Sequence, residues 1–165
     1  MTLTGEIGYQ YSKGETFQQS QLLPFEMDVL TGQLGLSWTG SSFVSLDYSV
    51  RGNASWVKAK EMQTVSQIRE LEQNFKSTIL LGDAWGITAN LQHYYDKNER
   101  REPLNFLFLG AGVYYSHDKY RVQVDLTNLT NIREQRFVWQ NGINRGFKST
   151  QLRGREVLIT LKIKK

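Results

Sequence analysis

The sequence predicts an all-β fold in which about eight antiparallel strands run up and down and form part or the whole of an outer-membrane β-barrel. Three observations lead to this class: period-two alternation of apolar and polar side chains, tight turns that alternate with long polar connections, and aromatic residues near both strand ends. No run of about eighteen apolar residues occurs, which excludes a membrane-spanning helix. Alternating barrel strands average to a hydrophilic score, so the mean hydropathy of -0.47 is compatible with a membrane barrel.

Eight strands can be followed along the chain by this alternation. The third is the most regular, because apolar and polar residues alternate from Val44 to Trp56 without interruption. In the fourth, Val65, Ile68 and Phe75 are spaced as in a helix; we predict a strand with a polar outer half and keep a short helix as the alternative. The predicted strands cover residues 3–12, 33–39, 44–56, 65–81, 85–95, 106–115, a seventh from Tyr120, and 157–163.

The connections between these strands are of two kinds, which indicates two different rims. Tight turns are predicted at residues 39–42, 82–84 and 116–119. Long polar connections are predicted around residues 13–24, 57–64, 97–103 and 132–150. Short turns are typical of the periplasmic side of an outer-membrane barrel, so both termini are expected on that rim.

Aromatic residues on the apolar faces predict two girdles that contact outer-membrane lipid. The girdle beside the tight turns consists of Trp38, Trp85, Tyr115 and Tyr120. The girdle toward the long connections consists of Tyr11, Trp56 and Tyr95. About ten residues separate Trp85 from Tyr95, which is roughly what a tilted strand needs to cross the hydrocarbon.

Charged residues on the opposite faces predict a polar network that lines the barrel interior. Its expected members are Glu6, Asp47, Arg51, Arg121, Asp125 and Glu156. Acid pairs among them resemble catalytic carboxylates, but arginines share the same faces, so neutralisation of charge is the preferred reading and no enzymatic activity is expected. His93 and His117 are expected on opposite rims and hence form no metal site, and no cofactor is predicted.

The composition and the long connections bear on possible partners. Lys and Arg number 20 against 16 Asp and Glu, and the basic residues are scattered, so no nucleic-acid partner is expected. Cysteine is absent, which excludes disulfides and thiol chemistry. The last long connection mixes aromatic and basic residues that could contact a ligand at the outer face. These candidate ligand contacts are Arg136, Phe137, Trp139, Arg145 and Phe147.

The final strand carries apolar side chains at every second position, opposite a polar face that begins with Glu156 and continues with Lys162. The apolar positions are Val157, Ile159, Leu161 and Ile163. A strand that ends the chain leaves an unpaired edge. Pairing this edge with the first strand would close a barrel, and a closed barrel is one of only two architectures that a bilayer tolerates.

The segments KYRVQVDLTNLTN and QLRGREVLITLKI resemble the C-terminal end of TonB-dependent receptors, particularly those of Bacteroidota. The first pattern is matched by Asp125, Leu126, Asn128, Leu129 and Asn131, and Thr130 stands where an aromatic residue is usual. The second pattern is matched by Gln151, Leu152, Arg153, Arg155 and Glu156, with Gly154 in place of proline. The terminal aromatic residue of the family is replaced by the ending Ile163, Lys164 and Lys165.

The resemblance implies that residues 1–165 are a single β-barrel region, the C-terminal segment of a larger barrel of about twenty-two strands in the bacterial outer membrane. The remaining strands, the plug, the TonB box and the signal peptide, which this sequence does not contain, would lie upstream. The implied function is TonB-driven uptake of a scarce nutrient such as a chelated metal, a vitamin or a glycan. The implied partners are outer-membrane lipid, the barrel-assembly machinery, the rest of the barrel and plug, and TonB through the upstream segment.

Two alternatives follow from the residues themselves. A complete eight-stranded outer-membrane barrel with an anchoring or adhesion role satisfies the strand number and places both termini on one rim. A soluble lipocalin-like binding barrel would require the apolar face of every strand to point inward.

Overall fold

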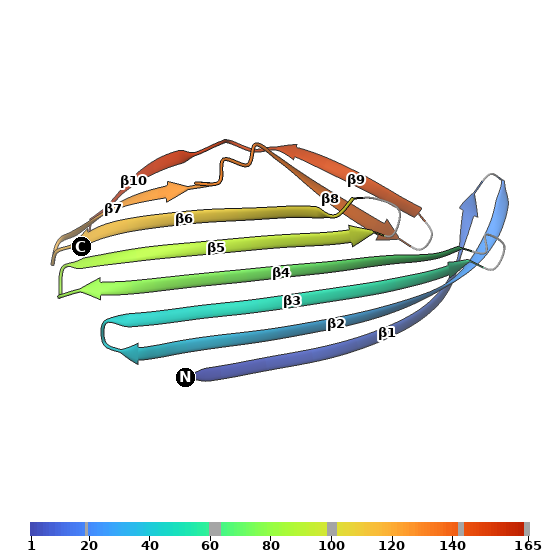
Figure 1. Ribbon diagram of the computed structural model, residues 1–165, viewed down its shortest axis with the longest axis horizontal. Helices are drawn as coiled ribbons and strands as arrows, with labels where there is room; N and C mark the ends of the chain where they lie inside the picture. Colours follow the sequence, from blue (N-terminus) through green and yellow to red (C-terminus); the bar gives the residue numbers. More distant parts are fainter. Residues whose placement is uncertain (19, 60–63, 99–101, 142–143, 164–165) are drawn as a thin grey trace.

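The computed structural model describes residues 1–18, 20–59, 64–98, 102–141 and 144–163; within them it describes no side chain at 18, 41, 64–66, 138–141 or 144–145. Eight strands form one antiparallel sheet in the order β1-β2-β3-β4-β5-β6-β7-β10, and β8 and β9 pair separately as a hairpin (Figure 1). The strands are β1 Thr2–Gln18, β2 Gln21–Ser41, β3 Val44–Ala59, β4 Thr64–Leu81, β5 Trp85–Asn98, β6 Leu104–Ser116, β7 Tyr120–Thr127, β8 Glu134–Asn141, β9 Asn144–Gln151 and β10 Glu156–Ile163.

The predicted all-β, up-and-down antiparallel class is confirmed. Each strand of the large sheet pairs with its neighbour in sequence except β10, which pairs with β7 because the β8–β9 hairpin lies between them in the chain. No helix among the described residues is long and apolar enough to cross a membrane. Figure 1 shows both termini toward the end of the sheet at which the tight turns lie.

The sheet is open, and the expected pairing of the last strand with the first is not formed. The predicted closing-strand residues Val157, Ile159, Leu161 and Ile163 face Leu126, Val124, Val122 and Tyr120 of β7. In the described chain β1 and β10 are both edge strands, each with a single neighbour. Eight strands in this arrangement correspond to a portion of a barrel, since closure requires both edges to be paired.

The first hairpin is much longer than predicted, because residues 13–18 and 21–24 belong to the ends of β1 and β2. Lys13 lies opposite Glu26 and its Nζ is 3.2 Å from a Glu26 carboxylate oxygen. Ser20 adopts a positive φ of 65° in the turn that joins the two strands. The predicted loop was therefore wrong: its polar residues pair across a ladder. The tight turns are confirmed, with the first shifted to Ser42 and Phe43.

Other predicted connections change as well. Residues 57–59 extend β3 and residues 97–98 extend β5, whereas 60–63 and 99–101 lie outside the described residues. The last connection contains the β8–β9 hairpin. The alternative helix over residues 65–75 is wrong, because β4 pairs with β3 and β5 along its length and this cross-strand bonding overrides local helix propensity.

The register divides the large sheet into two faces, because residues directly opposite each other in an antiparallel ladder point to the same side. One continuous row crosses six strands on what we name the apolar face: Leu3, Leu36, Tyr48, Phe75, Leu91 and Leu109. A neighbouring row lies on the opposite side, the polar face: Thr2, Ser37, Asp47, Lys76, Asn90 and Gly110. The sheet therefore has one apolar and one polar side across its width.

Toward the long connections this facing inverts within the same strands. Lys13, Asp28 and Lys58 lie on the apolar side, while Val57 and Ile68 lie on the polar side and are only 2% and 4% exposed. Leu23 and Ala59 are the other buried apolar residues, and both also belong to the polar side. The small core of this chain thus lies beyond the apolar band, at the end of the sheet where the hairpin is found.

Candidate functional site

All seven predicted girdle residues occupy apolar-face positions in the register, and one of them, Tyr95, also lines the cavity described below. Beside the tight turns the rings of Trp85 and Tyr115 have centroids 5.0 Å apart, and those of Tyr115 and Tyr120 are 6.2 Å apart, so three adjacent strands share one aromatic cluster. Trp38 lies opposite Leu46 at the same end. At the other end, Tyr11 and Trp56 lie on either side of Asp28, and Tyr95 lies opposite Leu71 and Asn105. Their contact with lipid stays a prediction.

The six residues of the predicted interior network all lie on the polar face, but amide side chains rather than ion pairs connect them. Gln33 lies between Glu6 and Arg51, and its Oε1 accepts hydrogen bonds from Arg51 at 3.0 and 3.3 Å. Gln123 accepts from Arg121 at 3.3 Å and donates to Asp125 at 2.8 and 2.9 Å.

The other network members bond to neighbours outside the set. Asp47 accepts a hydrogen bond of 2.8 Å from Ser37, and Glu156 accepts one of 3.3 Å from Arg153. The Arg121 guanidinium also lies 3.5 Å from the centroid of the Tyr114 ring. The predicted network residues thus belong to a hydrogen-bonded surface of side chains on the polar face.

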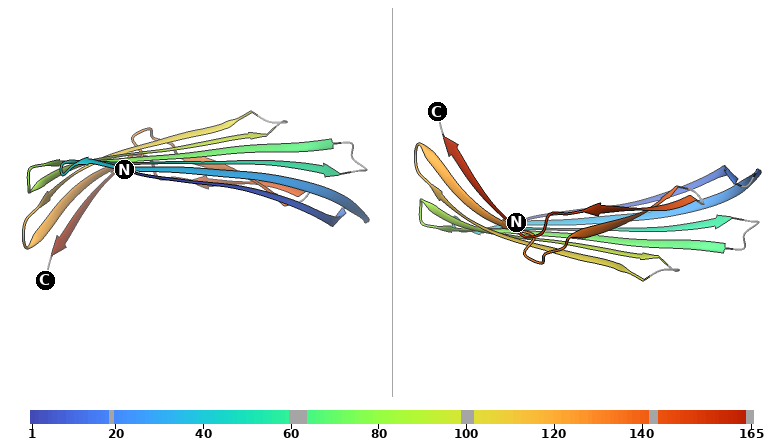
Figure 2. Two further views of the ribbon diagram at one scale, coloured as in Figure 1. Left: turned by 90° about the horizontal axis from the view of Figure 1, so that it is seen from below. Right: turned by 90° about the horizontal axis from the view of Figure 1, so that it is seen from above.

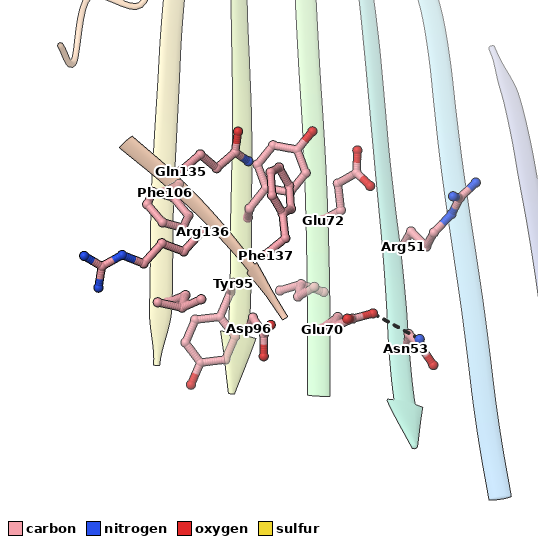
Figure 3. A pocket seen from close by; sticks show the side chains of 13 residues that line it. Arg51, Asn53, Glu70, Glu72, Tyr95, Asp96, Phe106, Gln135, Arg136 and Phe137 are labelled. Atoms are coloured by element: carbon pink, nitrogen blue, oxygen red, sulfur yellow. Dashed lines mark hydrogen bonds between the residues drawn. The ribbon is translucent and has the colours of Figure 1, made fainter. Parts of the chain in front are cut away.

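The β8–β9 hairpin folds over the polar face, on the side toward which β10 curls (Figure 2). In Figure 3 strand β8 runs diagonally across β6 and β5 near their ends and reaches the edge of β4, and its residues Gln135 and Phe137 line the cavity there. The last predicted long connection therefore contains a pair of strands, β8 and β9, that covers part of the polar face.

A corner centred on Asn128 fixes the base of this hairpin. The Asn128 Nδ2 donates to the carbonyl oxygens of Ile132 at 2.7 Å and of Arg153 at 2.8 Å, and reaches that of Gly154 at 3.3 Å. Its Oδ1 accepts a hydrogen bond of 3.0 Å from the Ile132 amide. One side chain therefore connects the segment that enters the hairpin with the segment that leaves it.

The backbone completes this corner. Asn128 and Asn131 have positive φ values of 50° and 60°, a conformation that asparagine tolerates better than most residues. The Leu152 amide donates to the Arg133 carbonyl at 2.8 Å, and Arg155 Nε donates to the Leu129 carbonyl at 3.0 Å. The segments around Asn128 and Arg153 thus position the hairpin.

A cavity of about 190 Å³ lies between β8 and the polar side of the sheet. A second cavity, of about 580 Å³, adjoins it and shares Asp96, Leu104 and Arg136. We name the two together the hairpin groove. The first cavity is lined by Arg51, Asn53, Glu70, Leu71, Glu72, Tyr94, Tyr95, Asp96, Leu104, Phe106, Gln135, Arg136 and Phe137 (Figure 3). The second is lined additionally by Asn98, Glu102, Pro103, Glu134, Phe147 and Ser149.

The groove contains more acidic than basic side chains among the described residues. Glu70 accepts a hydrogen bond of 3.0 Å from Asn53, and Glu72 accepts one of 3.0 Å from Asn74. On the hairpin, Glu134 accepts from Arg136 Nε at 3.0 Å and from Ser149 at 2.6 Å. The hydrogen bond from Arg136, followed by that from Ser149, lowers the pKa of the Glu134 carboxyl. This carboxylate is therefore charged at neutral pH and connects β8 to β9.

The predicted ligand contacts are partly brought together here. Arg136 and Phe137 line the first cavity, and Arg136 and Phe147 line the second. The side chains of Trp139 and Arg145 lie outside the described residues. Sequence reasoning missed the sheet side of the groove, which includes Tyr94, Asp96 and Phe106. Aromatic residues at polar-face positions of the fifth and sixth strands were the available signal.

The two histidines bond locally. His93 Nε2 lies 2.9 Å from Asn105 Oδ1 on the apolar face, and the His117 ring stacks on Tyr120 with centroids 5.3 Å apart. Within the described part of the chain, no group of three acidic or histidine side chains is placed to hold a metal ion.

Comparison with known proteins finds no matching family model, no matching curated protein and no matching solved structure. The features of this chain that bear on its function are therefore the sheet, its two faces and the hairpin groove.

Proposed function

We propose that the chain is part of the wall of a bacterial outer-membrane β-barrel, in a receptor of the TonB-dependent type that takes up a scarce nutrient. The observation that carries the proposal is the facing of the open sheet: one side is apolar between two sets of aromatic residues, and the other side is polar and hydrogen-bonded. A soluble sheet would hide its apolar side, whereas a membrane barrel presents that side to lipid and encloses the polar side. The role is structural and non-enzymatic.

The length of the strands supports a position across the bilayer. β1 has 17 residues and β2 has 21, whereas a tilted strand crosses the hydrocarbon with about 9 to 11. The surplus coincides with the inverted segment, where Lys13 and Lys58 replace apolar residues on the outside. Strand ends that extend beyond the membrane would meet water on the outer side and bury their apolar residues inward, as observed for Val57.

The TonB-dependent assignment is supported by the sequence resemblance over the last part of the chain and by the structural role of Asn128 in it. The open sheet favours a portion of a larger barrel over a complete eight-stranded anchor. In this proposal the chain contacts outer-membrane lipid, the barrel-assembly machinery and the remaining strands and plug, and it meets TonB only through the upstream segment.

Cell fractionation and uptake test the proposal. The intact protein is expressed in its host, its membrane fraction is separated by density, and growth on limiting nutrients is compared with and without the tonB gene. We expect the protein in the outer-membrane fraction and a growth defect, upon its deletion, that loss of TonB reproduces. A protein that stays in the soluble fraction as a monodisperse monomer without detergent would refute the membrane assignment and favour the lipocalin-like carrier.

A further inference from the structure

We propose that the hairpin groove binds an uncharged, polyhydroxylated chain, an oligosaccharide, with one ring in the cavity beneath β8 and the next rings in the adjoining cavity. The inference rests on the proposed function, because it takes the long-connection rim to be the outer rim. It assigns a ligand class to the groove, which the barrel architecture leaves open.

Aromatic side chains line the cavity from both elements. Tyr94 and Phe106 line it from the sheet, and Phe137 lines it from the hairpin; Phe106 and Phe137 can be followed in Figure 3. Tyr94 is itself held edge-on by Phe108, with ring centroids 6.3 Å apart. Sugar rings present flat C–H surfaces that pack on aromatic faces, and rigid aromatic side chains lose little entropy on binding.

Hydrogen-bond donors and acceptors line the cavity together with these rings. The carboxylates of Glu70, Glu72 and Asp96 accept hydrogen bonds, while Asn53 and Gln135 carry amides that both donate and accept. A sugar hydroxyl also donates and accepts, so neighbouring hydroxyls match a mixed lining of this kind. A purely apolar ligand would offer no donor to Asn53 Oδ1, which is buried without a hydrogen-bond partner in the described part of the chain, whereas a sugar hydroxyl could donate to it; an unpaired buried group of this kind costs about 1 to 3 kcal/mol.

The charges of the groove disfavour an anionic ligand. The groove contains the acidic residues Glu70, Glu72, Asp96, Glu102 and Glu134 against the basic residues Arg51 and Arg136, counted over the described lining. Both arginines already bond within the protein, Arg51 to Gln33 and Arg136 to Glu134. An anionic ligand would therefore meet net repulsion and no converging cations.

The sizes of the two cavities suit an elongated ligand. The smaller cavity, about 190 Å³, equals the liquid volume of roughly six water molecules at ~30 Å³ each, which suits one ring. The larger cavity of about 580 Å³ continues from it past Asp96 and Arg136. Two connected compartments of unequal size suit an elongated ligand built from repeating units better than a single compact molecule.

The test is binding of the intact protein, purified in detergent micelles, to an array of neutral, amino-substituted and acidic oligosaccharides. We expect neutral oligosaccharides to bind, and monosaccharides of the same type to bind more weakly because they occupy only the smaller cavity. Replacing Phe137 or Asp96 by alanine should weaken binding about tenfold or more. Phe137→Trp, which keeps an aromatic face, should retain binding.

Matched controls come from the same rim. Phe17, 71% exposed at the tip of the first hairpin, and Glu15 nearby lie outside the groove, so Phe17→Ala and Glu15→Ala should leave binding unchanged. The inference is overturned if no neutral oligosaccharide binds, if only the charged classes bind, or if Phe137→Ala and Asp96→Ala bind as well as the unaltered protein. Oligosaccharide binding by a protein absent from the outer-membrane fraction would support the ligand class and refute the proposed function instead.

Discussion

Replacement of Asn128 by alanine should release the β8–β9 hairpin from the polar side of the sheet. The side chain makes two short donor bonds, of 2.7 and 2.8 Å, and accepts one of 3.0 Å from the Ile132 amide; a longer bond of 3.4 Å from the exposed Thr130 hydroxyl is not counted, because this hydroxyl can bond to water instead. The contact of 3.3 Å with Gly154 shares a hydrogen already used, so three bonds are counted. At about 1 kcal/mol for each net hydrogen bond, their loss amounts to about 3 kcal/mol.

The backbone adds to this effect. Asn128 has a φ of 50°, and alanine is disfavoured in this left-handed region by about 1 kcal/mol. The total destabilisation of the corner is therefore about 4 kcal/mol. Asn128→Gly should recover about 1 kcal/mol of it, because glycine adopts positive φ freely. Asn128→Asp keeps the acceptor but places a carboxylate oxygen against the carbonyl oxygens of Ile132 and Arg153, so it should destabilise the corner at least as much as alanine.

Hydrogen exchange in detergent micelles measures the effect where it is expected, at the backbone amides of β8 and β9. About 4 kcal/mol corresponds to exchange roughly a thousandfold faster, since each 1.4 kcal/mol is a factor of ten. Asn105→Ala is the control, because this exposed residue has one side-chain bond, to His93. Acceleration of less than about tenfold in Asn128→Ala, or equal acceleration in the control, would show that the corner does not hold the hairpin.

Three further outcomes are expected. Val50→Arg, midway along the apolar band of β3, should destabilise the protein in lipid bilayers by about 2 to 4 kcal/mol in urea unfolding, and Ser49→Arg on the polar face should be far milder; equal effects would refute the facing. Because the Glu134 pKa is lowered in the folded state, its stabilising contribution is present above the usual glutamate pKa of about 4.3 and is lost as pH falls through the lower folded value. Protection of the hairpin amides, measured relative to the intrinsic exchange rate at each pH, should thus fall at acidic pH, and Glu134→Gln should remove this part of the pH dependence. Gly112→Ala places a Cβ against the Asp125 carboxylate and 3.2 Å from the Val124 carbonyl oxygen, so a loss of about 1 to 3 kcal/mol in thermal unfolding is expected; an unchanged midpoint would contradict the close packing.

The strands of the apolar band could be predicted from the sequence because the alternation within each strand is enough to show which of its residues face the apolar side. A strand with lipid or core on one side must alternate, and residues such as Val44, Leu46 and Tyr48 report their own facing without knowledge of the partner strand. The register then confirms that these residues share one side with Phe75 and Leu91.

The long strand ends were missed because apolar and polar residues exchange faces there. In β2, the apolar residues Phe25 and Met27 occupy polar-face positions, whereas the acidic residues Glu26 and Asp28 occupy apolar-face positions. A search for a continuing apolar face ends at this inversion and reads the residues as a loop. The pairing of Lys13 with Glu26 depends on residues of two strands together and is not visible in either segment alone.

The groove was predicted only on the hairpin side. Arg136, Phe137 and Phe147 were recognised from their composition, but the carboxylates opposite them belong to strands far away in sequence. Nothing local specifies that the hairpin folds inward. That direction is set by the Asn128 corner, whose bonds join residues 25 and 26 positions apart along the chain.

In the proposed outer-membrane location, the inversion of facing and the position of the groove have one physical origin. Where a strand is surrounded by lipid, its outward side chains must be apolar, and polar groups can be carried only on the enclosed side. Where the same strand extends into water, this constraint ends, and the enclosed side can combine buried apolar residues such as Ile68 with carboxylates such as Glu70 and Asp96. A site that needs aromatic faces and hydrogen-bonding groups together can therefore form on the interior side only beyond the lipid level. The hairpin, fixed at its base by Asn128, covers that part of the strands.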